Sequence, residues 1–143
     1  MKKVSQILAR KGNNIISVDV STTVLDTLKL MAEKNIGSVV ITEKGKYAGL
    51  LTERDYARKV ILMGKLSSET SVSEIMSTDL PHIAPDFSIE VCMHILGDKN
   101  LRYLPVFDKQ DNFCGIISIG DIVNETILTQ KDMIDQLHNY IHS

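Results

Sequence analysis

The sequence has few of the features that mark membrane, secreted or nucleic-acid-binding proteins. No apolar run approaches the roughly 20 residues that a membrane-spanning helix needs. Two lysines follow Met1 without a long apolar core behind them, so we expect no signal peptide and a cytoplasmic location. The net charge of -2 offers no broad basic surface, so we expect neither a nucleic-acid partner nor a membrane partner.

Cysteine is scarce, and the motifs of common catalytic and metal sites are missing. Cys92 and Cys114 have no CxxC spacing and are too few for a disulfide framework, so we interpret them as buried free thiols. GxGxxG, GxxxxGK[ST] and HExxH do not occur. His138 and His142, four residues apart on a helix, could share a metal, but we favour surface histidines. We therefore expect no enzyme, no catalytic residue and no bound metal.

What the chain does contain is an internal repeat with an offset of 65 or 66 residues. Its 143 residues, 43% of them apolar, suffice for one compact domain or two small halves that share a core. We expect a first repeat over 4–64, a polar linker over 65–71, a second repeat over 72–128 and a helical extension over 129–143. Each repeat reads as β-α-β-β-α, so the fold class is α/β, of the α+β kind.

The same local signals recur in both repeats. Short strands are expected over 15–18 and 81–85, and each is followed by a helix that Ser21 or Asp86 would cap. Strand pairs then follow over 36–51 and 101–117, and a helix is expected over 53–63. The last helix carries apolar residues about 3.5 residues apart, a spacing that suits packing on the protein body or pairing with another chain. We favour pairing within a dimer; these residues are Val123, Ile127, Ile134, Leu137 and Ile141.

Each repeat ends in a strand that opens on glycine and continues into Ser/Thr-x-x-Asp. The two copies are Thr52-Glu53-Arg54-Asp55 and Ser118-Ile119-Gly120-Asp121. A carboxylate accepts two hydrogen bonds side by side, which matches the neighbouring hydroxyls of a ribose. Thr52 and Ser118 stand at helix starts, where free N–H groups and the helix dipole favour a phosphate. The alternative is a capping box that only satisfies backbone N–H groups, and the two roles can coexist.

Further residues are candidates for binding around these two turns. Arg54 and Arg58 are four residues apart on one helical face and could add positive charge, although Arg58 could equally be a solvated helix charge. Gly120 would let a ligand approach closely. Ser17 and His82 hold matching positions on the first strands, where a base could stack or hydrogen-bond.

These residues resemble a known family. The stretches Asn100-Leu101-Arg102-Tyr103-Leu104-Pro105-Val106 and Gly115-Ile116-Ile117-Ser118-Ile119-Gly120-Asp121-Ile122, doubled at constant spacing, resemble a tandem pair of cystathionine-β-synthase (CBS) domains. The resemblance covers residues 4–127, and the stretch 51–60 is most similar to stand-alone prokaryotic CBS-pair signalling proteins. It implies two β-α-β-β-α repeats packed sheet to sheet with pseudo-twofold symmetry.

The resemblance also implies a function. Such modules commonly bind adenosine-containing ligands (AMP, ADP, ATP, NAD or S-adenosylmethionine) in the cleft between the repeats, form dimers, and signal to an effector protein through a conformational or dimer change. The alternative is an oligomeric interaction or scaffold protein with vestigial pockets, which the apolar spacing of the last helix motivates.

By the same resemblance, the motif aspartates Asp55 and Asp121 hold ribose hydroxyls, and the hydroxyl residues Thr52 and Ser118 lie near ribose or phosphate. A basic residue at the start of the strand before the motif can hold phosphate. Arg102 stands there in the second repeat, whereas Gly37 stands there in the first. The adjacent Tyr103 could flank a phosphate or simply pack. We therefore expect two related sites that differ in affinity or ligand.

Overall fold

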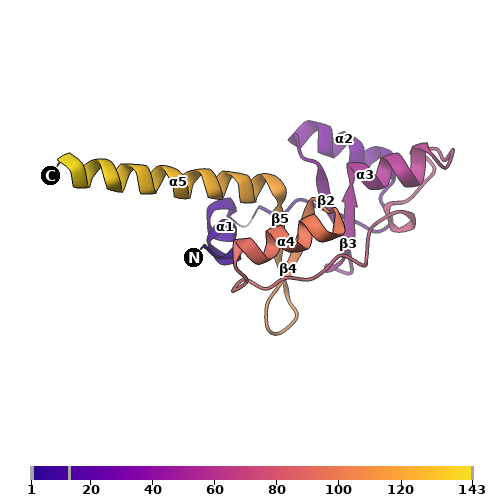
Figure 1. The fold of residues 1–143 in the computed structure, drawn as a ribbon. Helices are drawn as coiled ribbons and strands as arrows, with labels where there is room; N and C mark the ends of the chain where they lie inside the picture. The colour runs from indigo at the N-terminus through magenta and orange to yellow at the C-terminus, as the bar shows by residue number, and fades with distance from the viewer. Residues whose placement is uncertain (1, 13, 143) are drawn as a thin grey trace. The chain divides into compact units, whose positions relative to one another are not determined.

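The chain forms two compact units of mixed helix and strand (Figure 1). The computed structural model describes the backbone of residues 2–12 and 14–142, and their side chains up to residue 139. The central unit comprises Asn14–Leu80, and the terminal unit comprises Met1–Asn13 together with Pro81–Ser143. The predicted fold class is confirmed by this mixture of helices and two small sheets.

The central unit is built on a three-stranded sheet of order β1-β2-β3. β1 runs parallel to β2, and β2 runs antiparallel to β3. Side chains of the sheet and of the helices around it share one apolar core. The elements are β1 (Ser17–Asp19), α2 (Val24–Lys34), β2 (Ser38–Glu43), β3 (Lys46–Thr52), α3 (Glu53–Tyr56), the π-helical turn η1 (Ala57–Ile61) and the 3-10 turn η2 (Val72–Glu74).

The terminal unit has an antiparallel pair of strands, β4 and β5, with its own apolar core. The strand expected over 81–85 is reduced to one parallel bridge between Ile83 and Val106. Pro81 and Pro85 lack the N–H that a longer ladder would need. The named elements are α1 (Val4–Lys11), α4 (Ile89–Lys99), β4 (Tyr103–Phe107), β5 (Phe113–Ser118) and α5 (Ile119–His142).

The caps of α2 and α4 lie two residues later than the sequence predicted. Thr23 and Ser88, not Ser21 and Asp86, are the N-caps, and their hydroxyl oxygens accept backbone N–H groups at 3.1 and 3.2 Å. Ser21 instead donates to the Asp19 carboxylate at 2.6 Å, in the turn before the helix. The expectation was wrong because several hydroxyl and acid residues stand near each helix start, and each of them is a good cap.

Asparagine ends both α2 and α4, and the thiols follow the prediction closely. Asn35 and Asn100 end α2 and α4 in the left-handed conformation, with φ of 54° and 52°. Both cysteines are free; Cys92 is buried and Cys114 is half-buried. Cys92 lies on the buried face of α4, whereas the neighbouring Met93 is 50% exposed.

The segment that leads each sequence repeat packs in the unit of the other repeat. α1 begins the first repeat, but the backbone N–H of Val4 donates to the carbonyl of Phe87 at 3.0 Å in the terminal unit. Conversely, Ser77 and Leu50 exchange two backbone hydrogen bonds, at 2.9 and 3.0 Å, in the central unit. The compact units therefore divide the chain differently from the sequence repeats 4–64 and 72–128.

This exchange explains why glycine opens the apolar end of β3 and of β5. A Cβ on Gly49 would lie 2.9 Å from the carbonyl oxygen of Ser77. A Cβ on Gly115 would lie 2.9 Å from Cδ2 of Leu8, and Gly115 has a φ of +153°, which side chains rarely adopt. At both positions glycine makes room for the leading segment that lies against the strand.

α5 is the longest helix of the described chain and continues past the rest of the terminal unit (Figure 1). Its first part packs with α1, α4 and β5. From Gln130 to Asn139 every side chain is exposed. Within residues 2–12 and 14–142, no helix combines the length and the apolarity needed to cross a membrane.

Candidate functional site

The first turn, Thr52 to Asp55, joins β3 to α3 as a capping box. Thr52 is the N-cap of α3, and its hydroxyl accepts the backbone N–H of Asp55 at 3.1 Å. In return, Oδ2 of Asp55 accepts the backbone N–H of Thr52 at 3.0 Å and its hydroxyl at 3.1 Å. The capping alternative is thus realised here, and the turn is fixed by its own side chains.

The second carboxylate oxygen of Asp55 is also occupied. Oδ1 accepts the hydroxyl of Ser77 at 2.8 Å and lies 3.0 Å from the ammonium of Lys59. Lys59 also donates to the carbonyl of Ile75 at 3.0 Å. The Asp55 side chain is only 7% exposed. Both of its oxygens therefore have two donors each, and a ribose could bind only by displacing some of them.

The second turn, Ser118 to Asp121, joins β5 to α5 with the same reciprocal bonds. Oδ2 of Asp121 accepts the backbone N–H of Ser118 at 2.9 Å, and the Ser118 hydroxyl accepts the N–H of Asp121 at 3.0 Å. The ammonium of Lys11 donates to the same Oδ2 and to the carbonyl of Ile116, both at 2.8 Å. Oδ1 accepts no hydrogen bond from the described residues, and the side chain is 19% exposed. This carboxylate keeps an open acceptor.

α1 supplies a second cation to the start of α5. Nε of Arg10 lies 2.8 Å from Oε2 of Glu125, and the ammonium of Lys2 lies 3.9 Å from Oε1. Glu125 is 2% exposed and is four residues after Asp121 on α5. Asp121 and Glu125 are thus paired with cations of α1 and Lys2, which offsets their mutual repulsion on one helical face.

Arg102 and Tyr103 lie beside the second turn. The backbone carbonyl of Arg102 accepts the N–H of Ile119 at 3.0 Å, and Tyr103 is the cross-strand partner of Ser118. The Arg102 side chain is exposed. A Cβ on Gly120 would meet only the Ser118 hydroxyl oxygen, at 3.6 Å, so packing alone does not require glycine there. The structure therefore brings most of the predicted second-site residues together.

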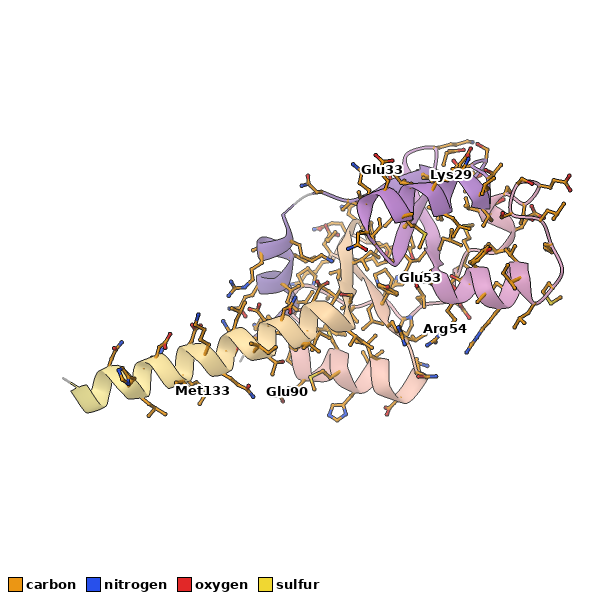
Figure 2. All side chains as sticks on the ribbon, turned by 90° about the horizontal axis from the view of Figure 1, so that it is seen from above. Lys29, Glu33, Glu53, Arg54, Glu90 and Met133 are labelled. Carbon is orange, nitrogen blue, oxygen red and sulfur yellow. The ribbon has the colours of Figure 1, made fainter. Side chains whose placement is uncertain are left out.

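The remaining candidates are more scattered. Arg54 is half-buried at the start of α3 (Figure 2), and Arg58 is exposed on η1. Ser17 is exposed on β1, and β2 separates it from Thr52. His82 is exposed and stacks on the ring of Phe107, with centroids 4.0 Å apart. Phe107 ends β4, whereas the second turn lies at the other end of that strand, where β4 begins.

Lys11 and Ser77 contact the motif aspartates but were not predicted from the sequence. Both belong to the segments that lead the repeats, which share the patterns Val-Ser-Gln-Ile-Leu and Val-Ser-Glu-Ile-Met. The repeated pattern marks the two segments as equivalent, but it does not predict which sheet each segment contacts. Among the described side chains, no group of three or more His, Cys, Asp or Glu could hold a metal ion.

Comparison with known proteins gives the family of this chain and of its fold. The family model described as CBS domain matches residues 4–61 and 72–126, once for each repeat. The chain belongs to the CBS-domain family and carries two copies of the domain.

Three proteins of known sequence or structure are similar to this chain. The CBS domain-containing protein CBSX3, mitochondrial, of Arabidopsis thaliana is 31% identical over 96% of this chain and 71% of its own length. A CBS-domain protein from Burkholderia ambifaria MC40-6 is 40% identical, with a TM-score of 0.84 over 90% of this chain and 96% of its own. CBSX2, solved in complex with AMP, is 23% identical, with a TM-score of 0.75 over 91% of this chain and 99% of its own.

Proposed function

We propose that this protein is a non-enzymatic regulatory module that binds an adenosine-containing nucleotide, with the turn from Ser118 to Asp121 as its principal site. The observation that carries the proposal is the open Oδ1 of Asp121, beside a lysine and at the start of a long helix. These features suit the sugar and the phosphate of a nucleoside phosphate. Hydroxyls of the sugar donate to the carboxylate, and the phosphate is attracted by the cation and the helix dipole.

The first turn is the weaker site in this proposal. A ribose that donated to Asp55 would have to displace hydrogen bonds from Thr52, Ser77 or Lys59. A broken bond from Thr52 or Ser77 leaves a part-buried donor without a partner, which costs free energy that the ligand must supply. At Asp121, by contrast, Oδ1 accepts a ligand hydroxyl without loss of a described hydrogen bond.

The fold supports an adenine nucleotide as the ligand class. The structure of CBSX2 contains AMP, so this fold can hold such a molecule. AMP, ADP, ATP and NAD share the ribose that Asp121 would bind, and we propose them as candidates. Regulation follows if the ligand has different affinities for two arrangements of the protein, and an effector protein then reads the change.

Thermal unfolding of ligand-free protein with AMP, ATP, NAD or S-adenosylmethionine tests the proposal. A ligand present at about 100 times its dissociation constant should stabilise the fold by about 2.7 kcal/mol. The protein should be unfolded and refolded beforehand, so that carried-over ligand is removed. Inorganic phosphate serves as the control for nonspecific anion effects. An unchanged melting temperature with all four ligands would count decisively against nucleotide sensing.

A second candidate function, assembly, is favoured by the exposed apolar face of α5. Figure 2 labels Met133 on the part of the helix that continues past the rest of its unit. An isolated helix of this length is marginally stable in water, so this part needs a partner to stay folded. We propose a second copy of the chain as that partner, which gives a homodimer. The exposed residues are Val123, Ile127, Met133, Ile134 and Leu137, at 49 to 65% exposure.

Removal of residues 130–143 should convert the dimer to a monomer, because the truncated chain loses the apolar face beyond Thr129. Molar mass from light scattering after size-exclusion chromatography measures this. Ile134→Asp with Leu137→Asp should have the same effect, whereas Asp132→Asn on the same stretch should not. A truncated protein that keeps the mass of the full chain would show that α5 is not the interface.

A further inference from the structure

Both motif aspartates are paired with a lysine, but the two lysines come from different parts of the fold. Lys59, four residues after Asp55, lies on the helix that follows the first turn, at 3.0 Å from the carboxylate. Lys11 lies on α1, far away in the sequence, at 2.8 Å from Asp121. Both turns therefore have a lysine at the motif carboxylate, but the two lysines belong to different elements of the fold.

The charges on the two helices explain why the origin differs. Glu125 stands four residues after Asp121, at the position that corresponds to Lys59 on η1, four residues after Asp55. An acid at this position cannot neutralise the aspartate, so the second turn takes its cations from elsewhere. Arg10 pairs with Glu125 and Lys11 pairs with Asp121, so adjacent residues of α1 serve the two acids.

Lys11 has capacity left for a ligand. Its ammonium carries three N–H donors, and two of them reach Oδ2 of Asp121 and the carbonyl of Ile116. The side chain is 40% exposed, so the remaining donor is accessible to a ligand. Lys59 also keeps one donor and is 44% exposed, but the carboxylate beside it is saturated by Thr52, Ser77 and Lys59, so a ribose cannot bind next to it without displacing them.

We propose that Lys11 is a specificity-determining residue that selects a 5′-phosphorylated nucleoside over the unphosphorylated nucleoside at the second turn. This inference rests on the proposed nucleotide site. Hydroxyls of the ribose donate to Oδ1 of Asp121, and the phosphate, on the far side of the same sugar, accepts the remaining N–H of Lys11. A cation between a carboxylate and a phosphate gains from both, whereas adenosine offers it no charge.

Isothermal titration with AMP and adenosine tests this inference on the full chain and on three variants. Wild-type protein should bind AMP about tenfold or more tightly than adenosine, because a charge-assisted hydrogen bond to phosphate is lost with the nucleoside. Lys11→Met should weaken AMP by about the same factor and leave adenosine nearly unchanged. Lys11→Arg should retain the preference. Lys109→Met, an exposed lysine of the same unit, should behave as wild type.

The possible outcomes separate the inference from the function on which it rests. Equal affinity of wild type for AMP and adenosine overturns the role of Lys11 but leaves the nucleotide site standing. A Lys11→Met protein that loses both ligands equally, or neither, also overturns it, since Lys11 would then only hold the fold or do nothing at the site. Binding of neither ligand to wild type refutes the proposed function and the inference together.

Discussion

Replacing Asp55 with alanine should lower the free energy of unfolding by about 3 kcal/mol. The substitution removes a carboxylate that is 7% exposed and that satisfies Thr52, Ser77 and Lys59. The donors of Thr52 and Ser77 are part-buried and would lack partners in the variant. Lys59 is 44% exposed and can return to water, so it contributes less to the loss. Urea denaturation, followed by circular dichroism, measures the change.

Asp121→Ala provides the matched comparison at the second turn. Asp121 is more exposed, and its donors are the backbone N–H of Ser118 and the half-exposed Lys11. We expect it to cost about 1 kcal/mol, the usual effect of a lost helix cap. Equal losses for the two variants, or a greater loss for Asp121→Ala, would contradict the claim that the first carboxylate is mainly structural and the second is not.

The sequence predicted the elements of this fold well because their signals are local. Apolar runs around a polar turn identified both strand pairs. The doubled Ser/Thr-x-x-Asp marked both strand-to-helix junctions, where Thr52 caps α3 and Ser118 bonds reciprocally with Asp121. Such patterns depend on residues a few positions apart, so the chain itself reports them.

The residues that local patterns did not identify are those brought in by tertiary contacts. Lys11 reaches Asp121 only because α1 packs in the terminal unit, and Ser77 reaches Asp55 only because its segment pairs with β3. Neither pairing follows from the spacing of residues along the chain. The sequence did hold one indirect sign, since Gly49 and Gly115 open the strands against which these segments lie.

The two turns therefore share a motif but differ in how much of it remains available to a ligand. In the first, Lys59 and Ser77 complete the coordination of the aspartate. In the second, Oδ1 of Asp121 stays open and the cation is carried by a separate helix. The sequence predicts an asymmetry through Arg102 and Gly37, and the hydrogen bonding of the two aspartates is a second difference between the turns.

Asp121→Asn should weaken AMP binding by about 100-fold, while Asp55→Asn should leave it nearly unchanged. The amide offers one acceptor in place of two and carries no charge, so the charge-assisted hydrogen bonds to the ribose hydroxyls are lost. Titration calorimetry gives both affinities, and circular dichroism confirms that each variant is folded.

The comparison of these two variants is informative because they make the same chemical change in the same motif. Asp55→Asn acts on a carboxylate whose oxygens are already occupied, so it should reduce stability and spare the ligand. Asp121→Asn acts on an open one, so it should spare much of the stability and lose the ligand. Unchanged AMP affinity in Asp121→Asn, or a loss confined to Asp55→Asn, would show that the principal site is not at the second turn.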